Sequence, residues 1–374
     1  MQGMIRIENV TNSSKSFFAH DRWIWDSVAA PQAHSSPTKA APITGSKMLA
    51  VQYSSCGGGV NDLKHVQVPV PSANKNEVLI RVEAASINPI DWKTQDGKLW
   101  PLLPRTLPLI PLTDIAGVVV DVGPDVQHVT AGDEVVAMLH PFRGGGFAEY
   151  AVASANLTVK RPPEVSAAEG AGLPVAAASA LQALRCTGAK FDGRSSQPPL
   201  HVLLTAASGG VGLYAVQLAK LANLHVAATC GARNMELVKS LGAEEVLDYN
   251  TPEGASLKST SGKKYDGVVH CTVGIGWSTF APLLCSSGKL IDLTPNFSAY
   301  ATSLLHLVTF SRKRLVPLLL RPNKADLEFL VGLVKARKLK TVIDSRYPFS
   351  DAARAWQTAM AGHATGKIII DMGT

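Results

Sequence analysis

The sequence predicts an α/β protein in which a doubly wound parallel sheet is joined to a second, mostly antiparallel domain with a barrel-like sheet. Strand-like and helical segments alternate between residues 201 and 293, which is typical of a parallel sheet. Short strand-like segments between turn residues dominate residues 48–152, which favours an antiparallel sheet. The chain has 374 residues, more than one hydrophobic core usually holds. We therefore expect one domain at 48–170 and 322–374 and another at 171–321.

Residues 1–47 differ in composition from the rest of the chain. They are rich in Ser, Thr, Ala and Pro, show no periodicity and contain no apolar core of a secretory signal. The acidic residues Glu8, Asp21 and Asp26 count against a transit peptide, which is usually poor in acidic residues. Two interpretations stay open for this segment, a disordered leader and a targeting segment.

The segments that follow the leader are strand-like, because apolar or β-branched residues recur between Gly, Pro and Asn residues. The predicted strands are Lys47–Tyr53, Leu63–Val68, Glu77–Glu83, Asp114–Val122, Glu134–Leu139 and Ala148–Val152. Turn residues at Val122–Asp125 and Thr130–Asp133 separate some of them. Short strands joined by such turns predict an antiparallel sheet.

The pattern changes after Glu164 to alternating helices and strands. Ala167–Leu184 is alanine-rich and predicts a helix that Pro174 must kink or restart. The segments after it are a strand at 201–207, a helix to about Ala222, strand His225–Cys230, helix Met235–Leu241, and strands Glu245–Tyr249, Asp266–Thr272 and Lys289–Leu293. Helix Lys324–Ala336 and strand Lys367–Asp371 are expected to return to the first domain.

The stretch His201–Gly212 carries the strongest functional signal. An apolar strand leads into a turn of small residues and then into a helix, and the turn reads Ala-x-Gly-x-x-Gly from Ala207. A pyrophosphate binds to such a turn because the N–H groups and the positive dipole end of the helix face it. We expect this turn to bind a dinucleotide through Ser208, Gly209, Gly210, Val211 and Gly212.

Residues at the end of the second strand of this unit bear on which dinucleotide is bound. NAD sites usually carry Asp or Glu about 20 residues after the glycines, where it binds the ribose hydroxyls. Here that place holds Thr229–Arg233 and no carboxylate. Arg233 can pair with a 2′-phosphate, and Tyr249 can cover the same pocket. The sequence therefore favours NADPH over NADH.

Composition and charge narrow the functional classes. Charged residues make up 17% of the chain and hydrophobic residues 46%, which fits a large buried sheet. The net charge of +7 suits an anionic cofactor or an anionic membrane surface, and no nucleic-acid-binding pattern is present. The five cysteines form no C-x-x-C, none of the ten histidines lies at a metal-like spacing, and no apolar run approaches the ~20 residues of a membrane span. We expect no metal and no nucleic-acid partner.

Five segments together resemble the zinc-free quinone oxidoreductase branch of the medium-chain dehydrogenase/reductase superfamily. They are Ala84–Lys93, Asp114–Gly117, Ala131–Val135, Ala206–Gly212 and Gly362–Lys367. The resemblance spans about Met48 to Asp371 and implies a Rossmann domain with a GroES-like catalytic domain. It also implies NADPH-dependent reduction of the activated C=C bond of enones and enals, with reduction of quinones as the alternative.

The resemblance assigns roles to several residues. The alcohol dehydrogenases of the superfamily bind zinc through a Cys in the region that matches Ile87–Asp91, and this chain has none there. A metal-free reaction needs a donor for the oxygen that becomes negative, and Lys93 is the first choice. Asn88 is the second choice for a site residue and is expected to bind the amide or the ribose of the cofactor. Lys367 is expected near the cofactor phosphates. The weaker cofactor candidates lie at predicted strand ends, and they are Thr113, Val273, Leu293 and Thr294.

The remaining candidates have structural roles or open alternatives. Asp91 is expected to orient backbone N–H groups, and His140 and His270 to be structural histidines. Trp92 and Trp100 suit either the wall of an apolar pocket or the core. Leu315–Leu320 is expected to be an edge strand, but beside Arg312–Arg314 it leaves a peripheral membrane contact open. A membrane-associated nucleotide-binding protein with little catalysis is therefore a third functional hypothesis. The protein is expected in the chloroplast, at the inner envelope or in the stroma, with the cytoplasm as the alternative, as a monomer or homodimer.

Overall fold

The computed structural model describes residues 45–98, 106–193 and 198–373. Contacts place Ile43–Thr374 in one compact unit. Of the predicted leader only residues 45–47 are described, and Trp100 lies outside the described residues.

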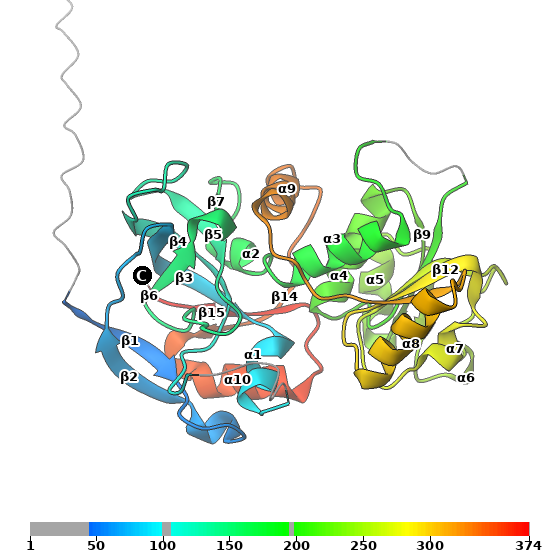
Figure 1. The fold of residues 1–374 in the computed structure, drawn as a ribbon, viewed down its shortest axis with the longest axis horizontal. Coiled ribbons are helices and arrows are strands. Elements are labelled where there is room, and N and C mark those ends of the chain that lie inside the picture. The colour runs from blue at the N-terminus through cyan, green and yellow to red at the C-terminus, as the bar shows by residue number, and fades with distance from the viewer. Residues whose placement is uncertain (1–44, 99–105, 194–197, 374) are drawn as a thin grey trace, which may run out of the picture. The chain divides into compact units, whose positions relative to one another are not determined.

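The strands between residues 201 and 317 form a parallel sheet (Figure 1). Its strands in spatial order are β10 (Glu245–Asp248), β9 (His225–Cys230), β8 (His201–Leu204), β11 (Tyr265–His270), β12 (Leu284–Asp292) and β13 (Arg314–Pro317). All neighbouring strands are parallel. The chain starts at β8, moves outward through β9 to β10, and then crosses to β11 on the other side of β8. This order confirms the predicted doubly wound sheet.

Helices cover both faces of this sheet. They are α3 (Ala176–Thr187), α4 (Gly210–Leu221), α5 (Met235–Ser240), α6 (Pro252–Ala255), α7 (Trp277–Phe280) and α8 (Phe297–Val308). Val202 and Leu204 of β8 pack in the hydrophobic core that contains α3 and α4. Leu203 packs in another core, with Phe280 of α7 and Ala299 of α8. Successive side chains of a strand point to opposite faces, so the apolar residues of β8 pack into two cores, one on each face of the sheet.

The other sheets are mostly antiparallel, as predicted. A seven-stranded sheet has the order β14 (Ile343–Pro348), β15 (Lys367–Asp371), β3 (Glu77–Ile87), β4 (Asp114–Val122), β5 (Glu134–Met138) and β7 (Thr158–Lys160), with β6 (Tyr150–Ser154) paired to β3. Only the β14–β15 pair of this sheet is parallel. A separate antiparallel pair consists of β1 (Lys47–Gln52) and β2 (Lys64–Pro69).

The helices that accompany these sheets are α1 (Pro89–Gln95), α2 (Ala167–Ala171), α9 (Lys324–Lys335) and α10 (Ala352–Ala361). Trp356 of α10 is fully buried in the core of the seven-stranded sheet. The C-terminal strand β15 pairs with β3, so the end of the chain returns to the sheet of the first half, as predicted. The strands of the parallel sheet lie within 201–317, whereas the domain boundaries near residues 170 and 321 stay predictions.

The sequence missed several elements. The predicted helix at Ala167–Leu184 is two helices, α2 and α3, which confirms the interruption at Pro174. Helix α8 was not predicted because large apolar side chains occupy its exposed positions, so no apolar–polar periodicity marks it. Strand β14 was missed because none of its residues is fully buried. The predicted edge strand at Leu315–Leu320 is confirmed in part, as β13 ends at Pro317.

Candidate functional site

The glycine turn between β8 and α4 has the predicted strand–turn–helix geometry. Gly209 is the N-cap of α4, with φ −80° and ψ 175°. A Cβ atom at Gly212 would lie 2.4 Å from the Ala206 carbonyl oxygen and 2.6 Å from the Cα of Ala207. Helix α4 therefore approaches the turn so closely that only glycine fits at residue 212. The first N–H groups of a helix have no intrahelical acceptor, which leaves this end of α4 suited to an anion.

A C-terminal segment, residues 363–366, lies against this turn. The Gly366 N–H donates to the Ser208 carbonyl at 3.1 Å, and Gly209 and Gly366 form a parallel β-bridge. Arg233 donates through Nη2 to the carbonyl of His363. Gly366 has φ +97°, and a Cβ there would lie 2.2 Å from the Val342 carbonyl oxygen. These contacts bring the loop before β15 to the expected phosphate site.

Arg233 and Tyr249 lie at the carboxyl ends of neighbouring strands. Arg233 is exposed in a single 3₁₀ turn that follows β9, and Tyr249 follows β10 with 52% of its surface exposed. The Tyr249 hydroxyl is 3.3 Å from the position of a Cβ on Gly231, in the loop before Arg233. The carboxyl ends of β8, β9 and β10 meet at one edge of the sheet, so both side chains lie at the edge that holds the glycine turn. One Arg233 donor is bound to His363, and a guanidinium has five.

A buried polar network joins α1 to β4 and β15. The Lys367 ammonium lies 2.6 Å from Asn88 Oδ1 and 3.3 Å from the Ile87 carbonyl oxygen. Asn88 donates through Nδ2 to Asp114 Oδ2 at 2.9 Å. The Asn88 N–H donates to Asp91 Oδ2 at 2.7 Å, so Asp91 orients a backbone N–H group as predicted. Asn88 is the N-cap of α1, and the network fixes where this helix begins.

Burial shifts the pKa values of the ionisable groups in this network. Burial raises the pKa of Asp91 to about 8, opposed by the hydrogen bond from Asn88 and reinforced by Asp114. Burial also raises the pKa of Asp114, opposed by the charge of Lys367. Burial lowers the pKa of Lys367, although both carboxyls oppose that shift. Lys367 is therefore not a solvated lysine, and its nitrogen is already bound to Asn88. Its predicted place at the cofactor phosphates stays a prediction, supported by its Cδ, 3.4 Å from a Cβ position on Gly210.

The raised pKa of Asp91 predicts how stability depends on pH. Asp91 ionises near its ordinary pKa of 3.8 in the unfolded chain and near 8 in the folded one. The folded state therefore holds a proton that the unfolded state has lost, and the free energy of unfolding falls as the pH rises from about 4 to about 8, by up to about 1.4 kcal/mol per pH unit. Asp91→Asn should remove this part of the fall.

Urea unfolding at pH 5 and pH 8 measures the difference. The wild type should lose more free energy of unfolding between the two pH values than Asp91→Asn does, while Asp125→Asn, at an exposed ion pair with Lys75, should behave like the wild type. Equal losses in the wild type and Asp91→Asn would contradict a neutral, buried Asp91.

Lys93 lies one turn along α1 from this network and is half-buried. Its nitrogen is 5.7 Å from the centroid of the Trp92 ring. Burial, and next the charge of Lys98, lower the pKa of the Lys93 ammonium, which makes it a better proton donor. Trp92 packs partly buried against the core of the seven-stranded sheet, so it serves the core as well as this lysine.

The other candidates lie next to strand ends, three of them after strands of the parallel sheet and Thr113 directly before β4. Val273 follows β11 with 66% of its surface exposed, and Leu293 follows β12, its N–H bound to the His270 carbonyl at 3.1 Å. Thr294 Oγ1 donates to the Thr272 carbonyl at 2.6 Å, which links the loops that follow β11 and β12. Thr113 is buried, and its Oγ1 lies 3.4 Å from Oδ1 of the adjacent Asp114.

The two histidines singled out from the sequence differ in setting. His270 is buried, with Nδ1 2.9 Å from Thr205 Oγ1, which fits the predicted structural role. His140 is exposed, and its Nδ1 accepts from the Phe142 N–H at 3.2 Å.

Comparison with known proteins identifies the family. Two family models match, "Alcohol dehydrogenase GroES-like domain" over residues 74–163 and "Zinc-binding dehydrogenase" over residues 241–370. The chain is 59% identical over 330 residues to the "Chloroplast envelope quinone oxidoreductase homolog" of Arabidopsis thaliana, which covers 88% of this chain and 100% of the relative. The chain belongs to the quinone oxidoreductase branch of the medium-chain dehydrogenase/reductase superfamily. It is an oxidoreductase, and its superfamily binds a nicotinamide cofactor.

Further relatives agree with this family. A "Quinone-oxidoreductase homolog, chloroplastic" of Spinacia oleracea is 60% identical, over 87% of this chain and 98% of the relative. An "NADPH-dependent alkenal/one oxidoreductase, chloroplastic" of Arabidopsis thaliana is 32% identical, over 87% of this chain and 79% of the relative. The solved structure of the quinone oxidoreductase from Coxiella burnetii has a TM-score of 0.76 and 31% identity, over 88% of this chain and 100% of that one.

The same relatives confirm two predictions. Asn88–Lys93, Thr229–Asn234 and Leu315–Leu320 predict a likeness to the chloroplast-envelope homologue of plants, and the Arabidopsis thaliana relative bears this out. The chloroplast names confirm the predicted location in the chloroplast. Among the described residues no helix has both the length and the apolar character that crossing a membrane requires.

The residues of the buried network do not fit the catalytic zinc ion of the family's alcohol dehydrogenases. Ile87–Asp91 contains no cysteine or histidine, and the ammonium of Lys367 lies where its positive charge would repel a cation. Within the described ranges, one group of three metal-ligating side chains is close enough for an ion, and it consists of His201, His225 and Glu245. The sequence missed this cluster because its members are 24 and 20 residues apart and meet only through strand pairing.

Proposed function

We propose that this oxidoreductase reduces the activated C=C bond of enones and enals with NADPH as the hydride donor. The observation that carries the proposal is the glycine turn with Arg233 beside it, at the sheet edge where α/β proteins bind their ligands. The name of the 32% identical Arabidopsis thaliana relative supports both the cofactor and the substrate class. NADPH, when bound, supplies a hydride to the β-carbon of the substrate.

The chain's own residues bind, position and stabilise charge in this proposal. The turn Ser208–Gly212 holds the pyrophosphate, Arg233 pairs with the 2′-phosphate and Tyr249 covers it. Asn88 and Lys367 are positioning residues, because their polar groups are bound to one another and hold the start of α1. Lys93, in that helix, is the catalytic donor to the substrate oxygen as it becomes negative. The oxygen then carries an enolate charge, and water supplies the proton to the α-carbon.

The remaining cofactor candidates complete the site. Val273 and Leu293 follow strands β11 and β12, so the proposal places them beside the nicotinamide end of the cofactor. Both loops follow the carboxyl ends of strands, as ligand-binding loops of such sheets do.

Quinone reduction is the alternative, and the names of the 59% and 60% identical relatives favour it. The two reactions share a hydride donor and a carbonyl oxygen that gains negative charge, so the same Lys93 and glycine turn serve both. NADPH consumption with a 2-alkenal, an alkenone and a benzoquinone separates them. Turnover of the alkenal or alkenone at a higher kcat/KM than the benzoquinone supports the proposal, and turnover of the benzoquinone alone would replace it with the alternative.

The selection of NADPH rests on Arg233. Arg233→Ala removes a charge-assisted hydrogen bond to the 2′-phosphate, which is worth about 1.5–3 kcal/mol, so the KM for NADPH should rise roughly 10- to 100-fold. The KM for NADH, which has no 2′-phosphate, should change little in the same variant and serves as its control. Equal rises for both cofactors would refute the phosphate assignment and indicate damage to the His363 contact instead.

One exposed apolar surface suits contact with a membrane. Apolar side chains on α8 and beyond have 59–89% of their surface exposed, and they are Phe297, Leu304, Leu305, Leu307, Val308, Phe310 and Leu319. The exposed Arg312 and Arg314 lie in the same stretch of chain. An apolar face next to basic residues suits an anionic membrane surface, so the proposal includes peripheral membrane contact. Salt-sensitive sedimentation with anionic vesicles is expected, and equal sedimentation with neutral vesicles would contradict the role of the arginines.

A further inference from the structure

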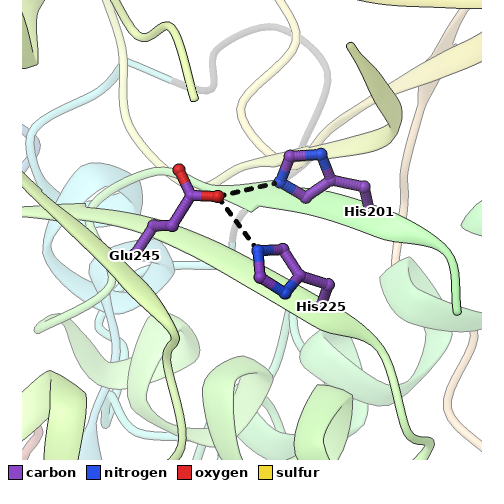
Figure 2. Close-up of side chains that lie close together, drawn as sticks. All are labelled: His201, His225 and Glu245. Atoms are coloured by element: carbon purple, nitrogen blue, oxygen red, sulfur yellow. Dashed lines mark hydrogen bonds and ion pairs between the residues drawn. The ribbon is translucent and has the colours of Figure 1, made fainter. Parts of the chain in front are cut away.

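A polar cluster lies at the edge of the parallel sheet opposite the glycine turn (Figure 2). His201, His225 and Glu245 are the first residues of β8, β9 and β10. These strands are adjacent and parallel, and His201 pairs directly with His225. Their amino ends therefore meet at one edge, whereas the glycine turn follows the carboxyl end of β8. The cluster takes no part in the proposed reaction.

The three side chains converge on one point. His225 Nε2 is 2.9 Å and His201 Nε2 is 3.5 Å from the same oxygen, Oε1 of Glu245 (Figure 2). One ligand atom from each of the three residues lies within 4.8 Å of the other two. Two atoms that bind a tetrahedral zinc ion at 2.0–2.1 Å are about 3.3 Å apart, and the two measured distances lie on either side of that value.

His201 is the member of the cluster whose ring makes no hydrogen bond. Only 6% of its side chain is exposed, neither ring nitrogen has a hydrogen-bond partner, and the 3.5 Å approach of Nε2 to Glu245 Oε1 is an ion pair only if the ring is protonated. A buried polar atom without a partner is rare in a folded protein.

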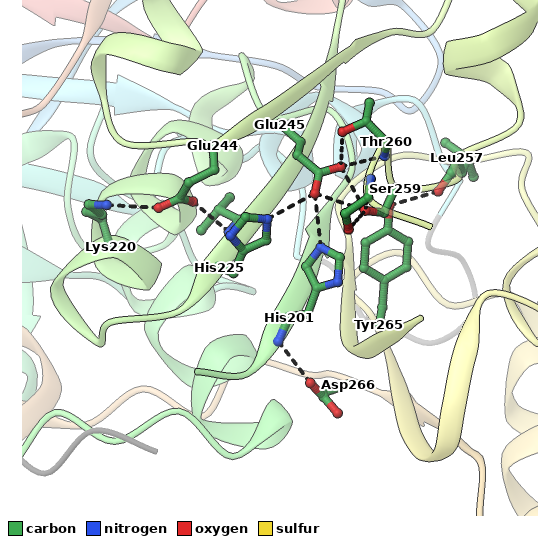
Figure 3. Close-up of polar contacts among 12 residues, drawn as sticks. His201, Lys220, His225, Glu244, Glu245, Leu257, Ser259, Thr260, Tyr265 and Asp266 are labelled. Carbon is green, nitrogen blue, oxygen red and sulfur yellow. Dashed lines mark hydrogen bonds and ion pairs between the residues drawn. The ribbon is translucent and has the colours of Figure 1, made fainter. Parts of the chain in front are cut away.

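Neighbouring residues hold Glu245 in place, as residues around a metal ligand usually do (Figure 3). Its Oε2 accepts hydrogen bonds from the Thr260 N–H at 2.7 Å, from Thr260 Oγ1 at 2.9 Å and from Ser259 Oγ at 2.8 Å. These hydrogen bonds orient the carboxylate so that its Oε1 faces the two histidine rings.

We propose that His201, His225 and Glu245 form a binding site for one divalent transition-metal ion, with zinc as the preferred ion. Two imidazole nitrogens and one carboxylate oxygen are a ligand set that zinc takes, with water in the fourth position. The side chain of His225 is 39% exposed, which gives the ion and its water a path from solvent. The bound ion ties together the amino ends of three strands, so the site is structural and independent of hydride transfer.

The experiment measures zinc binding to the full chain, purified without a histidine tag and freed of metal by a chelator. Equilibrium dialysis against Zn²⁺ followed by elemental analysis gives the zinc bound per chain. The wild type should bind one more zinc ion per chain than the His225→Asn variant does. We expect His225→Asn to lower the affinity for this zinc at least about 10-fold, because it removes a direct ligand. Half-exposed His225 should tolerate Asn, and Glu245→Gln provides a second variant that keeps the shape of the carboxylate. His65→Asn, at an exposed histidine on β2, is the matched control and should bind like the wild type.

Two results would overturn the proposal. One is a wild-type protein that binds no zinc in excess of His225→Asn. The other is an equal loss of zinc in His65→Asn and His225→Asn. A readout that does not depend on turnover completes the test, because zinc should raise the Tm of the wild type and of His65→Asn but not that of His225→Asn or Glu245→Gln.

Discussion

Replacing Gly209 by valine is expected to abolish nucleotide binding and to leave the chain folded. Gly209 has φ −80° and ψ 175°, which valine adopts without strain, and a Cβ there meets only the Ala206 carbonyl oxygen, at 3.3 Å. The valine side chain would instead occupy the space in front of the N-terminal N–H groups of α4. Losing two charge-assisted hydrogen bonds to the pyrophosphate, at about 1.5–3 kcal/mol each, weakens NADPH binding by roughly 100-fold or more.

Isothermal titration calorimetry measures the loss of affinity for NADPH, and a cooperative thermal unfolding transition shows that the variant is folded. Gly332→Val is the matched control, since a Cβ at Gly332 in α9 meets nothing within 4 Å. The control should bind NADPH like the wild type. Retained binding in a folded Gly209→Val protein would show that the pyrophosphate lies elsewhere.

Removing the amine of Lys93 is expected to slow turnover and to leave cofactor affinity nearly unchanged. The proposed role of Lys93 is to donate to the oxygen that becomes negative, and loss of one such donor costs about 10²–10³ in kcat. Lys93 lies on α1 and is not one of the turn residues that bind the pyrophosphate in the proposal, so Lys93→Ala should have little effect on the KM for NADPH. Steady-state kinetics with an alkenone measure both quantities.

A neighbouring lysine supplies the control for this prediction. The Lys98 nitrogen lies 5.3 Å from the Trp92 ring centroid and forms an ion pair with Asp96. Lys98→Ala removes a similar charge near the same ring, and its kcat should stay close to that of the wild type. Lys93→Tyr, which restores a donor, should recover part of the lost kcat. A Lys93→Ala protein with wild-type kcat would remove this residue from the reaction.

The sequence predicts those parts of the fold that are formed by contiguous residues. Strand β8, the glycine turn and helix α4 are contiguous, so their apolar run, small residues and helical period can be read directly. Helix α8 escapes this reading because the side chains that it exposes are apolar. Strand β14 escapes it because none of its residues is fully buried.

The candidate site also combines residues that sequence motifs mark with contacts that only the folded chain creates. Asn88 and Lys367 each carry a motif that the family resemblance marks, yet they are 279 residues apart and only the fold shows that they bind each other. Asp114 and Asp91 complete that network through burial, which no local pattern predicts. His201, His225 and Glu245 meet because adjacent parallel strands begin at one edge, and strand order is a property of the folded sheet.

The most direct test of the account follows the hydride itself. An alkenone is reduced by the enzyme with NADPH that carries deuterium at both C4 positions, and the product is analysed by NMR spectroscopy. Hydride transfer to the C=C bond should give a saturated ketone with one deuterium on the β-carbon. Deuterium on the carbonyl carbon of an allylic alcohol, or no transfer from NADPH at all, would contradict it.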